Sequence, residues 1–156
     1  MSIKGQLLSS DFLIASSIFI IVTAIIFSYW TYTTIQIEEN RKIDDIIDAA
    51  FLASNVWMRE GTPNYWNSTN VVDIGLQNNH RFNETKLVYL NEIGYSKVKS
   101  MIGLTQYNLY LRIYDFNNNT FFTFGNFSSN AENVVKIKRI GLLNNTIVYV
   151  DTVVWE

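Results

Sequence analysis

The pattern of apolar and polar positions divides the chain near residue 60. Residues 12–30 form an uncharged run, FLIASSIFIIVTAIIFSYW. At 1.5 Å of rise per residue, a helix of this length crosses a hydrocarbon core of about 30 Å. Tyr29, Trp30 and Tyr32 stand where an interfacial aromatic belt would lie. We therefore predict a single transmembrane helix over residues 12–30, with membrane lipid as its surroundings.

The run does not fit a conventional secretory signal. It is longer than the apolar region of such signals, about 7–15 residues, and SYWTYT offers no small-x-small cleavage site. We expect the helix to be retained in the mature protein. Lys4 lies before the span and Arg41 and Lys42 lie after it, so the charge distribution alone does not set its orientation.

Beyond the span the pattern becomes that of an amphipathic helix. Apolar or small side chains recur at steps of three and four residues: Ile43, Ile46, Ile47, Ala50, Phe51, Ser54, Trp57 and Met58. Gly61 and Pro63 are the expected stop, so we predict one helix over residues 6–60. A coiled coil is the competing interpretation, but the pattern lasts little more than two heptads. We expect the stripe around Phe51 and Trp57 to pack on a sheet.

The remainder, residues 61–156, is predicted to form a β-rich head domain. Asn83 or Thr85 caps a helix running to about Ile93, and Tyr95 or Ser96 opens a second helix that Gly103 ends. Alternating β-branched and aromatic residues then predict four antiparallel strands, over residues 107–116, 120–124, 134–143 and 146–155.

The turns and one irregularity of this sheet are also predicted. Asn117–Asn119 and Asn144–Asn145 suit tight hairpin turns, since asparagine tolerates positive φ. A change of parity in the third strand predicts a bulge near Lys138–Arg139. The expected fold class is α+β: a long N-terminal helix, transmembrane and then amphipathic, packed on a four-stranded antiparallel sheet.

Composition narrows the function further. A net charge of −2 and the lack of a basic patch argue against nucleic acid as a partner. There is no cysteine, His80 is the only histidine, and Asp44, Asp45 and Asp48 read as a solvated helix face. No nucleotide-binding or hydrolase motif is present, so we expect no catalytic residue, metal or cofactor. A membrane-tethered enzyme would need a polar cluster assembled from distant residues.

Asparagine is concentrated after the helix, with 16 of the 18 asparagines beyond Gly61. Five stand in Asn-x-Ser/Thr sequons: Asn67, Asn83, Asn118, Asn126 and Asn144. This number is a modest excess over the roughly two expected by chance, and it favours glycosylation and a head outside the cell. The alternative is that an asparagine-rich set of turns produces sequons by accident.

A short leader ending Lys4-Gly5-Gln6, a long apolar helix that becomes amphipathic and an asparagine-rich β head together resemble archaeal type IV pilin-like proteins with a class III signal peptide. The segment GTPNYWNSTNVVDIGL and the terminal Val-Val-Trp strand are similar to that family too. The resemblance implies that residues 1–5 are a leader, that a prepilin peptidase cuts between Gly5 and Gln6, and that the helix then assembles into a pilus-like filament. Ser9 and Asp11 lie one residue later than the serine and acidic positions of the family signal.

The resemblance also implies a role for Asp11. Pairing with the new amino group of a neighbouring subunit's Gln6 would offset the cost of burying this carboxylate and set the subunit register. The alternative is an interfacial charge that reaches the headgroups. Two functional classes follow: a structural or minor filament subunit that associates with itself or with other pilin-like subunits, and an uncleaved single-span membrane protein that presents a binding domain. Both place the protein at the cell membrane with its C-terminal domain outside, and the first extends to an extracellular filament.

Overall fold

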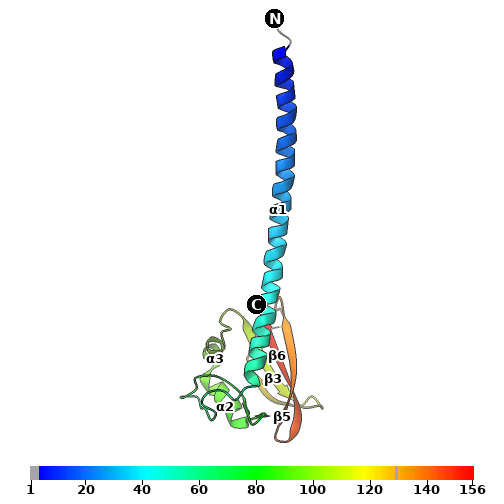
Figure 1. The fold of residues 1–156 in the computed structure, drawn as a ribbon. Helices are drawn as coiled ribbons and strands as arrows, with labels where there is room; N and C mark the ends of the chain where they lie inside the picture. The colour runs from blue at the N-terminus through cyan, green and yellow to red at the C-terminus, as the bar shows by residue number, and fades with distance from the viewer. Residues whose placement is uncertain (1–3, 129) are drawn as a thin grey trace. The chain divides into compact units, whose positions relative to one another are not determined.

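The computed structural model describes residues 4–128 and 130–156, with side chains from residue 10 onward. Residues 1–3 of the predicted leader lie outside this range. The elements follow in the order α1 (Lys4–Trp57), β1 (Gln77–Asn78), β2 (Arg81–Phe82), α2 (Glu84–Ile93), α3 (Tyr95–Met101), β3 (Asn108–Tyr114), β4 (Thr120–Phe124), β5 (Val135–Leu143) and β6 (Thr146–Trp155). The fold is therefore α+β with a long N-terminal helix, as predicted (Figure 1).

The chain divides into two compact units, one up to Lys42 and one from Ile43 to Glu156. The first unit is helical throughout its described residues. Residues 7–60 contain no glycine or proline, the two residue types that weaken a helix interior most. The second unit is the head, and it includes the last turns of α1 as well as all the strands.

The head contains a mixed six-stranded sheet in the order β1-β2-β5-β6-β3-β4. Strands β3 to β6 are the four predicted strands, and their mutual pairings are antiparallel. The prediction of a sheet with only four antiparallel strands is wrong, because β1 and β2 extend it and β2 joins β5 in parallel, through Phe82 and Leu143. Strands of two residues are too short to show an alternation in sequence.

Local signals in the sequence predicted the turns and short helices well. Asn83 caps α2, its side-chain oxygen accepting from the backbone N–H groups of Thr85 and Lys86. Gly94, with φ of 87°, separates α2 from α3. Asn144 and Asn145 have φ of 50° and 63°, the two positive values that a type I′ hairpin turn requires.

The predicted bulge in β5 is absent: β5 pairs with β6 in continuous register from Val135 to Leu143. The parity changes because Arg139 and Gly141 occupy inward positions, while Ile140 and Leu142 point outward. Arg139 fits inside because its Nε donates to Ser54 Oγ, 2.8 Å away, on α1. Gly141 is covered by the ring of Phe82, which would lie 2.4 Å from a Cβ at this position.

The buried face of α1 differs from the predicted stripe. Ile46, Ala50 and Trp57 are buried as expected, whereas Phe51 is 49% exposed. The prediction that Phe51 packs on the sheet is therefore wrong. The helix instead buries Ala49, Ala50 and Ala53, and these small side chains let the helix backbone approach the strands closely. At 100° per residue, Phe51 then lies about 140° around the helix from Ile46.

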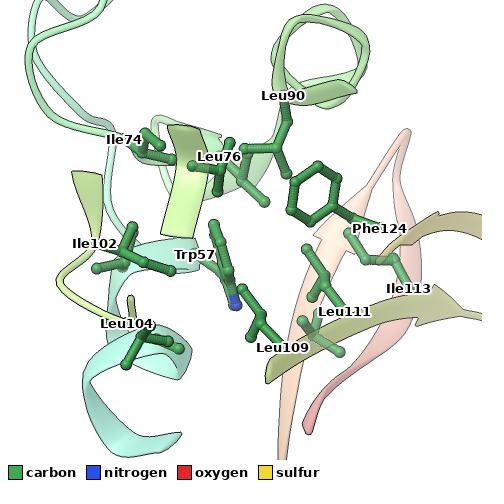
Figure 2. Close-up of a cluster of buried hydrophobic side chains, with 14 of the residues drawn as sticks. Trp57, Ile74, Leu76, Leu90, Ile102, Leu104, Leu109, Leu111, Ile113 and Phe124 are labelled. Atoms are coloured by element: carbon green, nitrogen blue, oxygen red, sulfur yellow. The ribbon is translucent and has the colours of Figure 1, made fainter. Parts of the chain in front are cut away.

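The core lies between the inner face of the sheet and the helices that cover it (Figures 1 and 2). Trp57 at the end of α1 sits in its middle and is fully buried. Three side chains of β3 line one side of Trp57, and residues from α2, from β4, from the loop after α3 and from the segment before β1 complete the cluster. The labelled members are Trp57, Ile74, Leu76, Leu90, Ile102, Leu104, Leu109, Leu111, Ile113 and Phe124.

The connection between α1 and β1 folds back on itself at two glycines. A Cβ on Gly75 would lie 2.4 Å from the backbone nitrogen of Gly61, so the two chain segments touch through their backbones. Trp66 is 1% exposed, and its Nε1 donates to the Gly75 carbonyl at 2.8 Å. The Gly-x-Pro-x-x-Trp and Ile-Gly-Leu motifs therefore belong to one packed structural unit.

A buried lysine fastens this connection to α2. The Lys86 ammonium donates to the backbone carbonyls of Glu60 and Gln77, the latter at 2.9 Å. It also lies 5.8 Å from the centre of the Trp66 ring. Burial lowers the pKa of Lys86, and the nearby carboxylate of Glu60 opposes that shift.

Candidate functional site

The first candidate surface is the apolar helix of the first unit. One helix of the described chain, spanning Ser10–Trp57, is long and apolar enough to cross a membrane. Its apolar window is 0% buried, and Phe12, Phe19, Phe27 and Trp30 are each about 70% exposed. Exposed apolar surface of this extent is typical of a segment that contacts lipid or another protein, because its exposure to water costs free energy.

Five hydroxyl groups on this helix donate to carbonyl groups of the helix itself. Ser17 Oγ donates to the carbonyl of Leu13 at 2.8 Å, and Thr23 Oγ1 donates to that of Phe19 at 2.7 Å. Thr31, Thr33 and Thr34 do the same one turn back each. An unsatisfied hydroxyl in hydrocarbon is costly, so these bonds suit the segment to an apolar environment.

The processing and assembly residues lie at the start of α1. Gly5 and Gln6 fall within its first turns, and their side chains lie outside the described part of the chain. Asp11 is exposed and immediately precedes the apolar run.

Four of the five sequon asparagines have structural roles of their own. Asn67 Oδ1 accepts from Thr69 Oγ1 at 2.7 Å within a turn, and Asn83 caps α2. Asn118 has φ of 66° and accepts from Arg112. Asn144 has positive φ, and its Nδ2 donates to Glu84 at 2.6 Å. These roles explain asparagine at those positions without glycosylation.

Asn126 differs from the other four. It is exposed in the segment after β4, and no hydrogen bond joins its side chain to the described part of the chain. Attachment of a sugar to its amide would therefore break no hydrogen bond with the described residues. A glycan at Asn144, by comparison, would replace one hydrogen of the amide that donates to Glu84.

The second candidate surface is the outer face of the sheet, which sequence reasoning missed. Neither α1, α2 nor α3 covers it, since all three lie on the inner side (Figure 1). At one end, Phe127 packs on Tyr110 and Trp155, with ring centres 6.4 and 5.3 Å apart. In the middle, Tyr114 and Tyr149 pair across β3 and β6, 5.6 Å apart.

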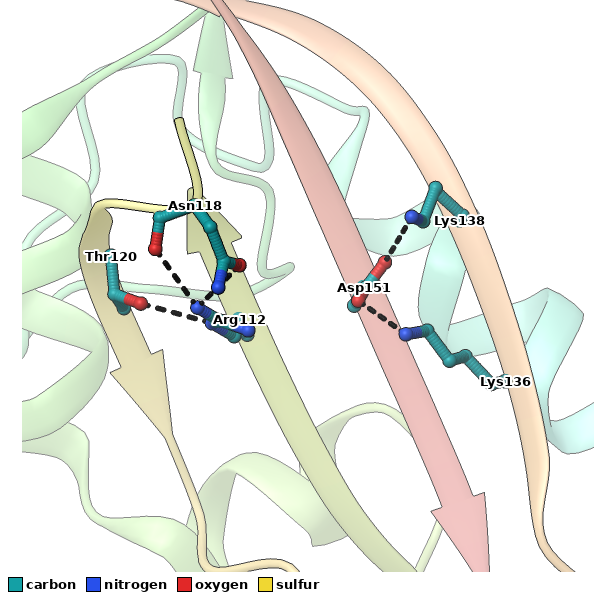
Figure 3. A network of polar contacts seen from close by, with 6 residues as sticks. All are labelled: Arg112, Asn118, Thr120, Lys136, Lys138 and Asp151. Carbon is teal, nitrogen blue, oxygen red and sulfur yellow. Dashed lines mark hydrogen bonds and ion pairs between the residues drawn. The ribbon is translucent and has the colours of Figure 1, made fainter. Parts of the chain in front are cut away.

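Charged residues on the same face lie near the Tyr114–Tyr149 pair, and Figure 3 shows their contacts with one another. The buried carboxylate of Asp151 pairs with Lys136 at 2.6 Å, and Lys138 lies 4.0 Å from its other oxygen. Lys138 also lies about 5.5 Å from the rings of Tyr114 and Tyr149. A hydrogen bond with Tyr114, together with Asp151, raises the pKa of Lys138. The alternation of lysine with apolar residues in β5, opposite an aspartate in β6, was the available sequence signal.

The β3–β4 turn is held by an arginine on the same face (Figure 3). Arg112 donates from Nε to Thr120 Oγ1 and from a terminal nitrogen to Asn118 Oδ1, both at 2.9 Å. Its guanidinium lies 4.5 Å from the Tyr114 ring centre. The outer face thus carries Arg112, Lys136 and Lys138 against the single carboxylate of Asp151.

The other candidate residues are not brought together. Asp44, Asp45 and Asp48 are each exposed, and His80 lies exposed in the β1–β2 turn. Within the described residues no three acidic or histidine side chains converge as metal ligands would. A shallow groove of about 620 Å³ between α2 and β4 is lined by Glu84, Asn91, Glu92, Leu87 and Phe122, which suggests no particular chemistry.

Comparisons with known proteins do not name a relative. No protein-family model, curated protein or solved structure matches the chain.

Proposed function

We propose that this protein is a membrane-anchored surface protein of the archaeal type IV pilin-like kind, a structural or minor filament subunit that assembles through its N-terminal helix. Its head is presented outside the cell. A prepilin peptidase would release residues 1–5 between Gly5 and Gln6, and the mature chain would associate with itself or with other pilin-like subunits.

The observation that carries this proposal is the uncovered apolar helix. Its residues 12–30 have no charge, and its apolar window has no buried residue. Such a surface must be covered by lipid, by other helices, or by each in turn. A filament subunit needs this property, because its helix is stored in a bilayer and is then transferred to a helical core.

Asp11 gives the assembly hypothesis a specific residue. It is exposed at the edge of the apolar run, where an unpaired carboxylate is costly once helices pack around it. Replacement of Asp11 by alanine should abolish or misregister assembly, as seen in filament yield by electron microscopy. Glu38→Ala, which removes an exposed carboxylate beyond the span, is the matched control. Normal filaments from the Asp11 variant would remove the register hypothesis.

The second candidate is the uncleaved single-span anchor, which differs from the first in that the Gly5–Gln6 bond stays intact. Intact mass and N-terminal sequence of protein from native membranes, made with its own peptidase, decide between them. A chain that begins at Gln6 supports the filament subunit. A chain that retains Gly5 supports the anchor and refutes processing.

Orientation and glycosylation can be tested on the same protein. The chain has no cysteine, so a single cysteine replacing exposed Lys97 on α3 reports which side of the membrane the head occupies. We expect labelling of intact cells by an impermeant maleimide. Mass increments should occur first on the peptide containing Asn126. Protection of this cysteine until the cells are lysed would refute an external head.

A further inference from the structure

The outer face of the sheet ends in a line of side chains on β5 that passes from charge to hydrocarbon. Lys136 and Lys138 come first, followed on the same face by Ile140 and Leu142. Ile140 is 63% exposed, and Ile147, opposite Leu142 on β6, is 61% exposed. Successive outward side chains on a strand are about 7 Å apart. No described element of the head covers this line.

The opposite side of the head carries a second uncovered surface, the back of α1. Asp44 and Asp48 lie about 160° around the helix from the buried Ile46, at 100° per residue. Phe51 and Leu52 follow on the same exposed side, 49% and 43% exposed. Neither carboxylate makes an ion pair within the described residues. Along this surface too, charged side chains are followed by apolar ones, but here the charge is negative.

The two surfaces carry opposite charges, and their side chains are spaced at similar distances. Asp44 and Asp48 are separated by about 6 Å along the helix, and Leu52 follows after another 6 Å or so. Lys136, Lys138 and Ile140 are separated by about 7 Å steps along β5. When the helix of one copy runs parallel to β5 of another, Asp48 faces Lys138 and Leu52 faces Ile140. Lys138 can still reach a second copy, because its side chain is 51% exposed and Lys136 is the closer partner of Asp151.

We infer that the exposed back of α1 in one copy docks on the outer sheet face of a second copy of this chain. This inference deepens the proposed function, because it supplies a contact between heads for the self-association proposed there. The two surfaces lie on opposite sides of one head, so the contact is head-to-tail and does not close into a dimer. A contact of this kind propagates from copy to copy, into a ring or an open filament.

Anchoring in one membrane makes such a contact effective even though each exposed ion pair is weak. Copies held by their helices in the same bilayer, or packed in the same filament, meet at a high effective concentration. Charge complementarity then selects the register, while Phe51, Leu52, Ile140 and Leu142 lose water together.

Cysteine cross-linking of the full-length chain in membranes tests the contact without background, since the chain has no native cysteine. The reporter combines Leu52→Cys with Ile140→Cys. We expect oxidation to give a ladder of dimers, trimers and larger species. The control combines Leu52→Cys with Lys97→Cys, which places the second thiol on the exposed α3 surface, and should give at least fivefold less cross-linked product. Equal cross-linking in reporter and control would overturn the inference.

Charge reversal tests the proposed register in the same reporter. Asp48→Lys alone, or Lys138→Glu alone, should each reduce the ladder at least fivefold. The two together should restore it, which an unfolded head would not do. Lys136 is left in place so that Asp151 keeps its ion pair. Reduction without restoration in the combined variant would overturn the pairing.

A third variant separates this contact from assembly through the helix. Ile18→Cys places a thiol on the apolar run, where that side chain is 57% exposed. Cross-linking through Ile18→Cys without the head ladder overturns the head contact and leaves the proposed function standing. The head ladder without cross-linking through Ile18→Cys supports the head contact and refutes helix-driven assembly. Failure of both overturns the head contact and the proposed self-association together.

Discussion

Replacement of Gly75 by alanine tests whether the connection between α1 and β1 is a close-packed unit. The added Cβ would lie 2.4 Å from the Gly61 nitrogen and 2.5 Å from the Arg59 carbonyl oxygen. Ordinary van der Waals contacts begin at 3.4 Å, so one backbone segment must move by about 1 Å. No side-chain rotation relieves a clash between two backbones.

The expected loss in the free energy of unfolding follows from the contacts that this movement breaks. It separates the Gly75 carbonyl from the Trp66 indole, now 2.8 Å away, and disturbs the Thr62–Asp73 backbone pair at 2.9 Å. Overpacking costs about 1–3 kcal/mol when side chains can adjust, so we expect Gly75→Ala to lower the free energy of unfolding by about 3 kcal/mol or more. That is a large part of the roughly 5–15 kcal/mol of a typical domain.

Gly103→Ala is the matched control. Gly103 has φ of 78° but nothing within 4 Å of an added Cβ, so the substitution introduces backbone strain without a clash. We expect it to cost about 1–2 kcal/mol. Urea unfolding of the full-length chain in a mild detergent, followed by tryptophan fluorescence, measures both, since Trp57 and Trp66 report on the core of the head. A loss from Gly75→Ala no greater than that from Gly103→Ala would refute the close-packing argument.

Three further predictions concern the head. Trp66→Phe should lower the free energy of unfolding by about 2–4 kcal/mol in the same urea assay, because it removes the hydrogen bond to Gly75 and part of a fully buried ring; wild-type stability would show that the indole N–H contributes nothing. Arg139→Met should cost about 1–2 kcal/mol and speed amide hydrogen exchange at the end of α1, because it removes the bonds to Ser54 and Asn55; unchanged exchange there would count against the tie. Asp115 accepts from the side-chain and backbone N–H groups of Asn119, which lower its pKa below the ordinary 3.8. Its contribution to stability is therefore fully present above pH 3.8 and is lost as the pH falls through the lower folded value. Asn119→Ala should shift the Asp115 carboxyl titration upward in an NMR experiment, and an unmoved titration would contradict this assignment.

Much of the fold could be predicted from sequence because its signals are local. An uncharged apolar run marks a helix that can cross a membrane whatever it packs against. Asn83, Gly94 and the Asn144–Asn145 turn act through hydrogen bonds or backbone angles within a few residues, so such signals can be recognised without any tertiary contact. The four long strands alternate clearly enough to be predicted as strands.

The tertiary structure decided which faces are covered. An apolar periodicity does not distinguish two neighbouring helix faces. The face lined by alanines is the buried one, because it lets the helix approach the sheet more closely than contact through Phe51 would. Arg139 and Gly141 face inward in β5 because of residues distant in sequence. Arg139 hydrogen-bonds Ser54, and the Phe82 ring packs on Gly141.

The candidate surfaces divide in the same way. Consecutive residues are enough to identify the apolar helix, the aspartate at its edge and the five sequons. Only the tertiary structure placed lysines from β5, an aspartate from β6 and an arginine from β3 on one uncovered sheet face, and two carboxylates on the opposite side of the head. Charge complementarity between surfaces is a property of three-dimensional placement, and no spacing along the chain encodes it directly.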